Sequence, residues 1–295
     1  MSINFDEIID RRGTSCLKYD FAVERGYPKD VLPFWVADMD FRAPVPVIDA
    51  LTARTAHGIF GYTQVKDDYF NVLRDWFRTR HAWTVQRDEL VITPGVVFAI
   101  ATAIRAYTAP NDAVIIQQPV YYPFASMIRQ NGRTLIDSPL RFADGHYSID
   151  FADFEQKIID HKVKLFVLCS PHNPVGRVWT RAELEQLAAI CLRHHVIVVA
   201  DEIHEEFVRP GFCHIPFASL SADAAAITVT CTSPSKTFNL AGLQISNIFI
   251  SDESLRRRFK EELSRTGYDE PNTLGLAGAK AAYEHGTPWL KELLA

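Results

Sequence analysis

The sequence predicts an α/β fold of three layers, in which a mostly parallel, seven-stranded sheet lies between two layers of helices. Two observations lead to this prediction. Short apolar runs alternate with helical patterns along the chain, and some of these runs, such as LFVLC and VIVVA, are apolar throughout. Strands of a parallel sheet are buried on both faces and have this composition, because neither face meets water.

Seven segments have the length and apolar character of such strands. They are residues 89–93, 113–118, 133–136, 164–169, 196–200, 227–231 and 245–250. Helical patterns fall between them. A helix is expected from Val96 to Tyr107, directly after a Pro-Gly pair, and Thr180 with Glu183 forms a capping-box signature ahead of another. Tyr69, Leu73, Trp76 and Phe77 mark a further helix, and residues 276–295 predict helix, turn and helix.

Composition excludes several classes of function. The net charge of −5 gives no electrostatic indication of binding to nucleic acid, and no run of Lys or Arg suggests binding to a membrane surface. No apolar stretch is long enough to span a bilayer, and the amino-terminal residues lack the apolar core of a signal peptide. The five cysteines form no CxxC pair, so neither a disulfide framework nor a zinc site is indicated, and a reducing cytoplasm is expected.

A lysine follows the strand at 227–231, in the segment Ser233-Pro234-Ser235-Lys236. The segment therefore lies at the carboxyl end of a strand, where open α/β sheets bind ligands. A partly desolvated lysine can act as a Schiff-base nucleophile, and both serine hydroxyls can bind phosphate. Taken alone, a solvated turn explains the segment equally well.

An aspartate follows the strand at 196–200, in Asp201-Glu202-Ile203-His204. At that position a carboxylate can pair with a buried cationic ring nitrogen, and His204 can point into the same cleft. The alternatives are a helix N-cap by Asp201 and a metal site. Zinc is disfavoured, because HEEF lacks the second histidine of the HExxH motif.

Three further groups follow other strands. Asn173 lies in a proline-rich loop after 164–169, and Tyr121 follows 113–118 and can stack on a flat ring. Gly95, Val96 and Val97 begin a helix, whose free backbone N–H groups suit a phosphate. Each group has an ordinary structural explanation, namely a turn, a core aromatic or a common strand-to-helix junction. Together, they place candidate ligands at five strand ends, as one cofactor site requires.

This set of residues, in this order and spacing, resembles the fold-type I enzymes that use pyridoxal phosphate (PLP), the aspartate-aminotransferase superfamily. The segments LPFWVADMDF (32–41), FGYT (60–63), CSPHNPVGRVWT, ADEIH and SPSKTFNLAG narrow the resemblance to the MalY/PatB-type cystathionine beta-lyases. WVADMDF and PHNPVGRVW are specific to that group, whereas the NPxG and SxxK patterns are shared with aminotransferases. The resemblance runs through essentially the whole chain and implies the PLP-dependent transferase-like large domain.

The resemblance also implies roles for individual residues. Lys236 would hold PLP as a Schiff base, Asp201 would pair with the protonated ring nitrogen, and Asn173 would hydrogen-bond the ring oxygen. Tyr121 would stack on the ring. His204 stands where many relatives carry a tyrosine, so its role is in doubt.

Other residues would complete the site. Ser233 would hold the phosphate with the backbone amides of Val96 and Val97, next to Gly95, and Ser235 is a weaker candidate for this task. Tyr62 would reach into the site of a second subunit and take part in catalysis there, which implies a homodimer. No metal is expected.

The resemblance also predicts how the chain is divided. Residues 1–46 would form an amino-terminal arm, 47–285 the PLP-binding large domain, and 286–295 the start of a truncated small domain. Enzymes of this plan run about a hundred residues longer. The missing part normally carries the arginine that clamps the substrate carboxylate, and no residue of this chain can be assigned that role.

The expected activity is β-elimination from a small amino-acid substrate. Cystathionine, or a similar cysteine S-conjugate, would be cleaved at its Cβ–S bond to a thiol such as homocysteine, pyruvate and ammonia. This would place the chain in methionine biosynthesis. Three alternatives remain: an aminotransferase on the same scaffold, a PLP-binding regulatory protein or inactive fragment, and a zinc protein that uses His204 and its acidic neighbours.

Overall fold

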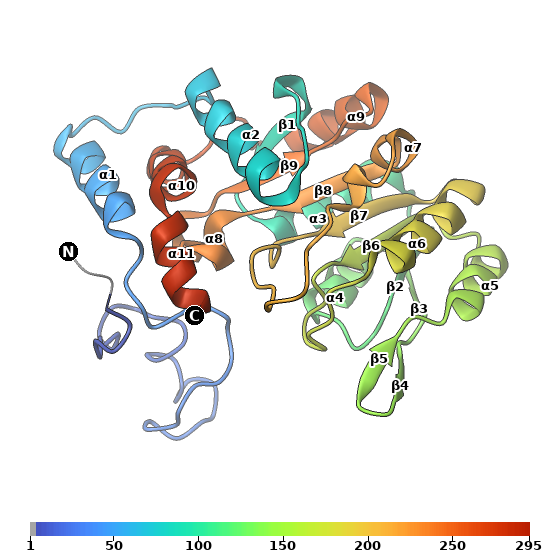
Figure 1. Ribbon diagram of the computed structural model, residues 1–295, viewed down its shortest axis with the longest axis horizontal. Helices are drawn as coiled ribbons and strands as arrows, with labels where there is room; N and C mark the ends of the chain where they lie inside the picture. Colours follow the sequence, from blue (N-terminus) through green and yellow to red (C-terminus); the bar gives the residue numbers. More distant parts are fainter. Residues whose placement is uncertain (1–3) are drawn as a thin grey trace.

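A seven-stranded sheet runs through the middle of the protein in the computed structural model, which describes residues 4–295 (Figure 1). All seven predicted strands are present, each within a residue or two of the expected bounds. They are β1 (Leu90–Thr93), β2 (Ala113–Ile116), β3 (Thr134–Asp137), β6 (Leu165–Cys169), β7 (Ile197–Asp201), β8 (Thr228–Thr232) and β9 (Ser246–Phe249). Their order across the sheet is β1-β9-β8-β7-β6-β2-β3.

The sheet is mostly parallel, as predicted. Strand β9 pairs antiparallel with both β1 and β8, whereas β8, β7, β6, β2 and β3 pair parallel in turn. The carboxyl ends of the parallel strands therefore meet at one edge of the sheet. Because β9 runs in the opposite direction, it enters the sheet at this same edge, next to the end of β8.

Helices cover both faces of the sheet and form the predicted layers. One face packs against α3 (Val96–Tyr107), α4 (Pro123–Gln130) and α9 (Glu253–Ser264), and the other against α5 (Phe151–His161), α6 (Arg181–Arg193) and α7 (Ala222–Ala226). Successive strand residues join opposite clusters: Val167 packs with the first group of helices and Leu168 with the second. This alternation explains why β6, LFVLC, is apolar throughout.

A third apolar cluster lies at the β1–β9 end of the sheet. It contains residues of α1 (Val45–Ala56), α2 (Asp67–His81), α10 (Thr273–His285) and α11 (Thr287–Leu294), beside the sheet in Figure 1. The predicted carboxyl-terminal helix, turn and helix are thus present. Trp289 of α11 is buried, and its indole N–H donates to the Arg42 carbonyl at 3.1 Å.

The local signals for helices are also confirmed. Helix α3 begins at Val96, and α2 buries the four predicted residues together with Phe70. At α6, the Thr180 hydroxyl accepts from the Glu183 N–H at 3.3 Å, and the Thr180 N–H donates to the Glu183 carboxylate at 2.7 Å. This reciprocal pair is the predicted capping box.

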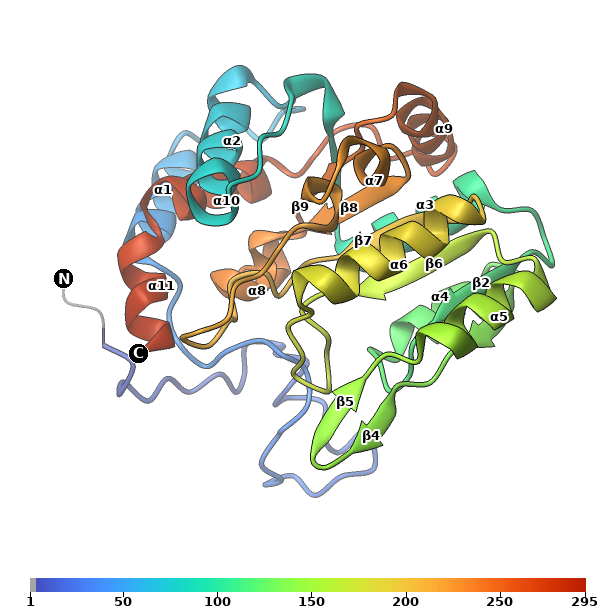
Figure 2. The same ribbon diagram turned by 45° about the vertical axis from the view of Figure 1, so that its right-hand side comes forward.

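The hairpin of β4 (Arg141–Ala143) and β5 (His146–Ser148) was not predicted. It projects from the sheet beside α5 (Figure 2). Its strands are short and largely exposed, so they lack the apolar run that marks the other strands. The short helices α8 (Pro234–Thr237), η1 (Arg87–Glu89), η2 (Phe217–Ser219) and η3 (Ala241–Leu243) complete the described secondary structure.

Residues 4–44 contain no helix or strand, and the segment passes below the sheet in both views (Figures 1 and 2). The division at residues 46 and 286 stays a prediction. None of the helices that the structure describes is long and apolar enough to cross a bilayer.

Candidate cofactor site

A cavity of about 510 Å³ opens at the edge where the parallel strands end. Its volume is in the range of small-molecule sites. The residues that line it come from six separate segments: Phe34, Trp35, Val36, Ala37, Gly95, Val96, Val97, Tyr121, Tyr122, Cys169, Asn173, Asp201, Ile203, His204, Ser235 and Lys236. The structure thus brings most of the predicted site residues to one cavity, although they are spread over 140 positions of the sequence between Gly95 and Lys236.

Asp201 is the last residue of β7, in register with Cys169 of β6 and Cys231 of β8. Because side chains alternate along a strand, the Asp201 side chain shares the face of Val199, on the α3 side of the sheet. It is 4% exposed, and its Oδ1 accepts from the Ile203 N–H at 3.2 Å. Burial raises the pKa of Asp201 to about 7.

A buried carboxylate with one hydrogen bond carries a large desolvation cost. A cation in the adjoining cavity would offset that cost and keep the carboxylate ionised. The protonated ring nitrogen of PLP is a cation of this kind, so the Asp201 environment fits the group that the sequence resemblance implies.

Lys236 lies on α8, which begins two residues after the end of β8. Its Nζ donates to the Ala37 carbonyl at 3.1 Å. Burial lowers the pKa of Lys236, and the negative charges of Asp38 and Asp201 oppose this shift. Partial desolvation therefore increases the share of the neutral amine, which is the nucleophilic form.

Helix α3 presents its amino terminus to the cavity through Gly95, Val96 and Val97. Gly95 is the N-cap residue, no side chain caps the helix, and its first turn contains no acidic residue. The space where a Cβ atom of residue 95 would project is open to a distance of 4 Å. The first backbone N–H groups of the helix lack intrahelical acceptors, so this end suits a phosphate.

The remaining groups are neutral. Burial raises the pKa of the Tyr121 phenol, which packs 5.9 Å from the Phe124 ring, centroid to centroid. Burial, with the charge of Lys236, lowers the pKa of His204 to about 4. Asn173 donates its backbone N–H to Cys169 Sγ at 3.4 Å. A cofactor in the cavity would meet hydrogen-bonding groups and an aromatic ring here rather than additional charges.

The two predicted phosphate-binding serines differ in position. Ser233 is 2% exposed and does not line the cavity; its hydroxyl donates to the Ile245 carbonyl at 2.8 Å and accepts from the Ser235 N–H at 3.1 Å. Ser235 does line the cavity. The Ser233 hydroxyl is engaged in capping α8, so Ser235, the weaker candidate of the two, is the serine that the structure places at the cavity.

Tyr62 is also absent from the cavity lining of this chain. It is 94% exposed, in an extended segment between α1 and α2 that also exposes Ile59 and Phe60. The structure thus does not bring Tyr62 to the cavity of its own chain.

Sequence reasoning assigned no role in the cavity to residues 34–37 of the amino-terminal segment. Asn239, three residues after Lys236, anchors the residues that directly follow this segment. Its amide accepts from the Met39 N–H and donates to the Met39 and Phe41 carbonyls, each at 2.9 Å. The signal was visible as the motif WVADMDF, but a motif in an irregular segment does not indicate which side chains face a cavity.

Comparison with known proteins agrees with this geometry. Residues 29–286 match the aminotransferase class I and II family. The chain is 47% identical to cystathionine beta-lyase PatB of Bacillus subtilis over 292 residues, which are 99% of this chain and 76% of PatB.

Two solved structures are similar throughout. Cystalysin of Treponema denticola, a structure that contains PLP, gives a TM-score of 0.95 at 37% identity and covers 100% of this chain and 75% of its own. The PLP-bound C-S lyase of Staphylococcus hominis gives a TM-score of 0.93 at 36% identity, with coverage of 100% and 74%.

Proposed function

Because this chain belongs to the aminotransferase class I and II family, we propose that it is a PLP-dependent β-lyase that cleaves the Cβ–S bond of cystathionine or a similar cysteine S-conjugate. One observation carries the proposal. A single cavity combines a partly desolvated lysine, a buried carboxylate and an uncapped helix terminus in a chain 47% identical to a cystathionine beta-lyase.

In this proposal, each group has a task that follows from its surroundings. Lys236 would hold the cofactor through its Nζ, and the same amine, when free, would accept the substrate α-proton. When bound, PLP supplies an electron sink for the pair left on the α-carbon. Asp201 keeps the ring nitrogen protonated, because its buried carboxylate is stable only beside a cation.

The other cavity groups hold the cofactor in place. The start of α3 and the Ser235 hydroxyl bind the phosphate, Asn173 hydrogen-bonds the ring oxygen and Tyr121 stacks on the ring. The Ser233 hydroxyl accepts a hydrogen bond from the Ser235 N–H and so helps to fix the position of Ser235. His204, as a neutral imidazole, donates or accepts one hydrogen bond near the ring.

The proposed reaction balances with water as co-substrate. Cleavage of the Cβ–S bond of cystathionine releases homocysteine, which takes a proton on sulfur. Water then converts the remaining three-carbon fragment to pyruvate and ammonia.

The five free cysteines fit an enzyme of the reducing cytoplasm.

We also propose a homodimer in which Tyr62 completes the cavity of the partner subunit. An exposed apolar segment around Tyr62 supports this, because Ile59 and Phe60 are 68% and 59% exposed. Sedimentation should return twice the chain mass, and Phe60→Asp should shift it toward the monomer. A monomeric wild-type protein with full activity would contradict the proposal.

The family match also favours a second candidate, an aminotransferase. The experiment that separates the two is incubation of the purified holoenzyme with cystathionine in the absence of any keto acid. A lyase releases pyruvate and homocysteine in equal amounts over many turnovers. An aminotransferase stops after one turnover and resumes only when a keto acid is added.

A further inference from the structure

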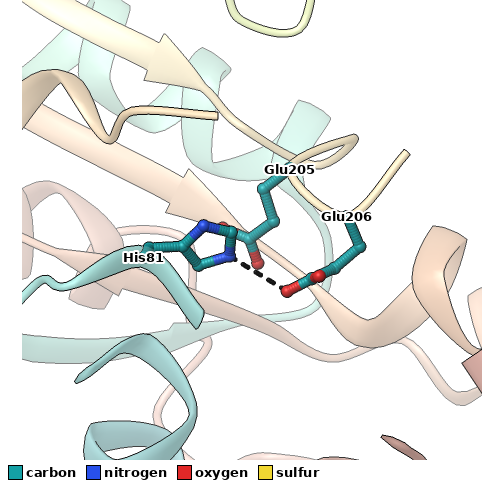
Figure 3. A group of neighbouring side chains, drawn as sticks. All are labelled: His81, Glu205 and Glu206. Carbon is teal, nitrogen blue, oxygen red and sulfur yellow. Dashed lines mark hydrogen bonds and ion pairs between the residues drawn. The ribbon is translucent and has the colours of Figure 1, made fainter. Parts of the chain in front are cut away.

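Five titratable side chains gather where the end of α2 meets the turn after β7. His81 is the last residue of α2, and Glu205 and Glu206 lie in the turn (Figure 3). Glu202 and His214 adjoin them, and the rings of His81 and His214 are 5.4 Å apart, centroid to centroid. All three glutamates are at most 4% exposed. None of the five lines the cofactor cavity.

Donor atoms in this cluster converge. One atom each from His81, Glu205 and Glu206 lie within 4.8 Å of one another, and the same holds for Glu202, Glu205 and His214. His81 Nε2 lies 3.0 Å from Glu206 Oε1, as Figure 3 shows, and Arg80 Nε donates to Glu206 Oε2 at 2.6 Å. Glu205 belongs to both groups and therefore lies at the centre of the cluster.

Glu205 has a buried oxygen without a partner. Its Oε2 forms no hydrogen bond within residues 4–295, although the side chain faces His81 and Glu206. By contrast, Glu202 accepts from the Phe217 N–H at 2.8 Å and lies 3.1 Å from His214 Nε2. A carboxylate in the position of Glu205 is costly unless a cation accompanies it.

The charge of the cluster favours a bound cation. The three glutamate side chains face one guanidinium, that of Arg80, which lies against Glu206 and not against Glu205. A cation bound between His81, Glu205 and Glu206 would supply the partner that the Glu205 oxygen lacks.

We propose that His81, Glu205 and Glu206 bind a divalent cation, and that the cation is Zn²⁺. A mixed set of imidazole and carboxylate ligands suits zinc, whereas Ca²⁺ and Mg²⁺ prefer oxygen ligands alone. Glu206 can bind the ion through Oε1 while Arg80 holds its Oε2, and this second contact orients the carboxylate. The site is independent of the proposed lyase activity.

This zinc site differs from the one that the sequence suggested at His204. The acidic pair next to His204 lacks a second histidine nearby in the chain, which disfavoured a metal there. In the structure His204 lines the cofactor cavity, and the histidine beside Glu206 comes from α2, 125 positions away.

The test measures zinc binding by the untagged holoenzyme in equilibrium dialysis with ZnCl₂. We expect one Zn²⁺ per chain in the wild type and an affinity at least tenfold weaker in Glu205→Gln. Glu205 forms no hydrogen bond that the substitution would break at Oε2, so the fold should persist, as circular dichroism can verify. Glu261→Gln, an exposed glutamate on α9, is the matched control and should bind like the wild type.

His81→Gln provides a second variant on a different element and should weaken binding as well. X-ray absorption at the zinc edge should show nitrogen and oxygen ligands at about 2.0–2.2 Å and no sulfur. Equal zinc affinity in the wild type, Glu205→Gln and His81→Gln would overturn the proposal. So would a sulfur ligand, which would assign the ion to a cysteine, such as the exposed Cys213.

Discussion

The cofactor cavity has two walls, and they are built differently. The sheet edge contributes Asp201, which is paired in β7, and Lys236, which lies on α8 four residues after the end of β8. The opposite wall, residues 34–37, belongs to a segment without helix or strand. Asn239 anchors the residues that directly follow this wall, Met39 and Phe41. Regular secondary structure thus positions the groups proposed to react, whereas a few side-chain contacts anchor the chain next to the wall that encloses them. Substitutions on the two walls should therefore differ in effect.

The largest effect should come from Lys236→Ala at the sheet edge. Without the amine, the protein should lose the absorbance of the covalently attached cofactor, and pyruvate release should fall by roughly 10³-fold or more. Lys260→Ala, on the exposed side of α9, should behave like the wild type. If cofactor absorbance and activity both survive in Lys236→Ala, the proposed role of the sheet edge is wrong.

The next effect concerns Asp201 in the cofactor-free protein. Its folded pKa of about 7 exceeds the ordinary value of 3.8, so the folded state retains a proton that the unfolded state has lost. Stability from this residue therefore decreases as pH rises through this interval. Between pH 5 and 7, the wild type should lose about 2 kcal/mol of unfolding free energy relative to Asp201→Asn.

Urea unfolding of both cofactor-free proteins at each pH measures this difference. Other titrating groups, including Glu205 and His204, are common to the two proteins, so their contributions cancel. Parallel pH profiles would mean that Asp201 is not desolvated as described. Adding PLP should reduce the difference, because a cation beside Asp201 stabilises its charged form.

The smallest effect should come from Asn239→Gly, which releases the opposite wall. Asn239 has a φ of +60°, which glycine adopts without strain, so the substitution removes three hydrogen bonds while sparing the backbone. A loss of about 1–2 kcal/mol is expected, seen as a roughly tenfold lower kcat/KM with cofactor absorbance retained.

The matched control is Asn111→Gly. Asn111 is exposed and has a φ of +70°. It precedes the amino end of β2, whereas the cavity lies at the carboxyl ends of the parallel strands. Activity in Asn239→Gly equal to that of the control would show that the irregular wall does not depend on this anchor. A loss as large as that of Lys236→Ala would show that the two walls are equally important.

Sequence patterns predicted the sheet edge better than the rest of the molecule. Asp201 follows a continuous apolar run, VIVVA, whereas the strand before Lys236 has Val229 and Cys231 between threonines. Residues at the ends of both strands must meet because parallel strands share an edge. Residues 34–37 and Asn239 could not be placed in this way, because no periodicity specifies an irregular segment. The cluster of His81 with Glu205 could not be predicted from the sequence for a related reason, because only tertiary packing brings its two elements together.

The reversed direction of β9 has a consequence for how the lysine is held. The connection that carries Lys236 leaves the sheet at Thr232 and returns beside it at Ser246, where Thr232 pairs with Asn247 and Ser233 bonds to Ile245. This connection is closed by neighbours in the chain, unlike the long crossovers that join parallel strands. Its closure costs little chain entropy, and its contacts are local in sequence. The lysine is thus carried on a short loop whose two ends are fastened to each other.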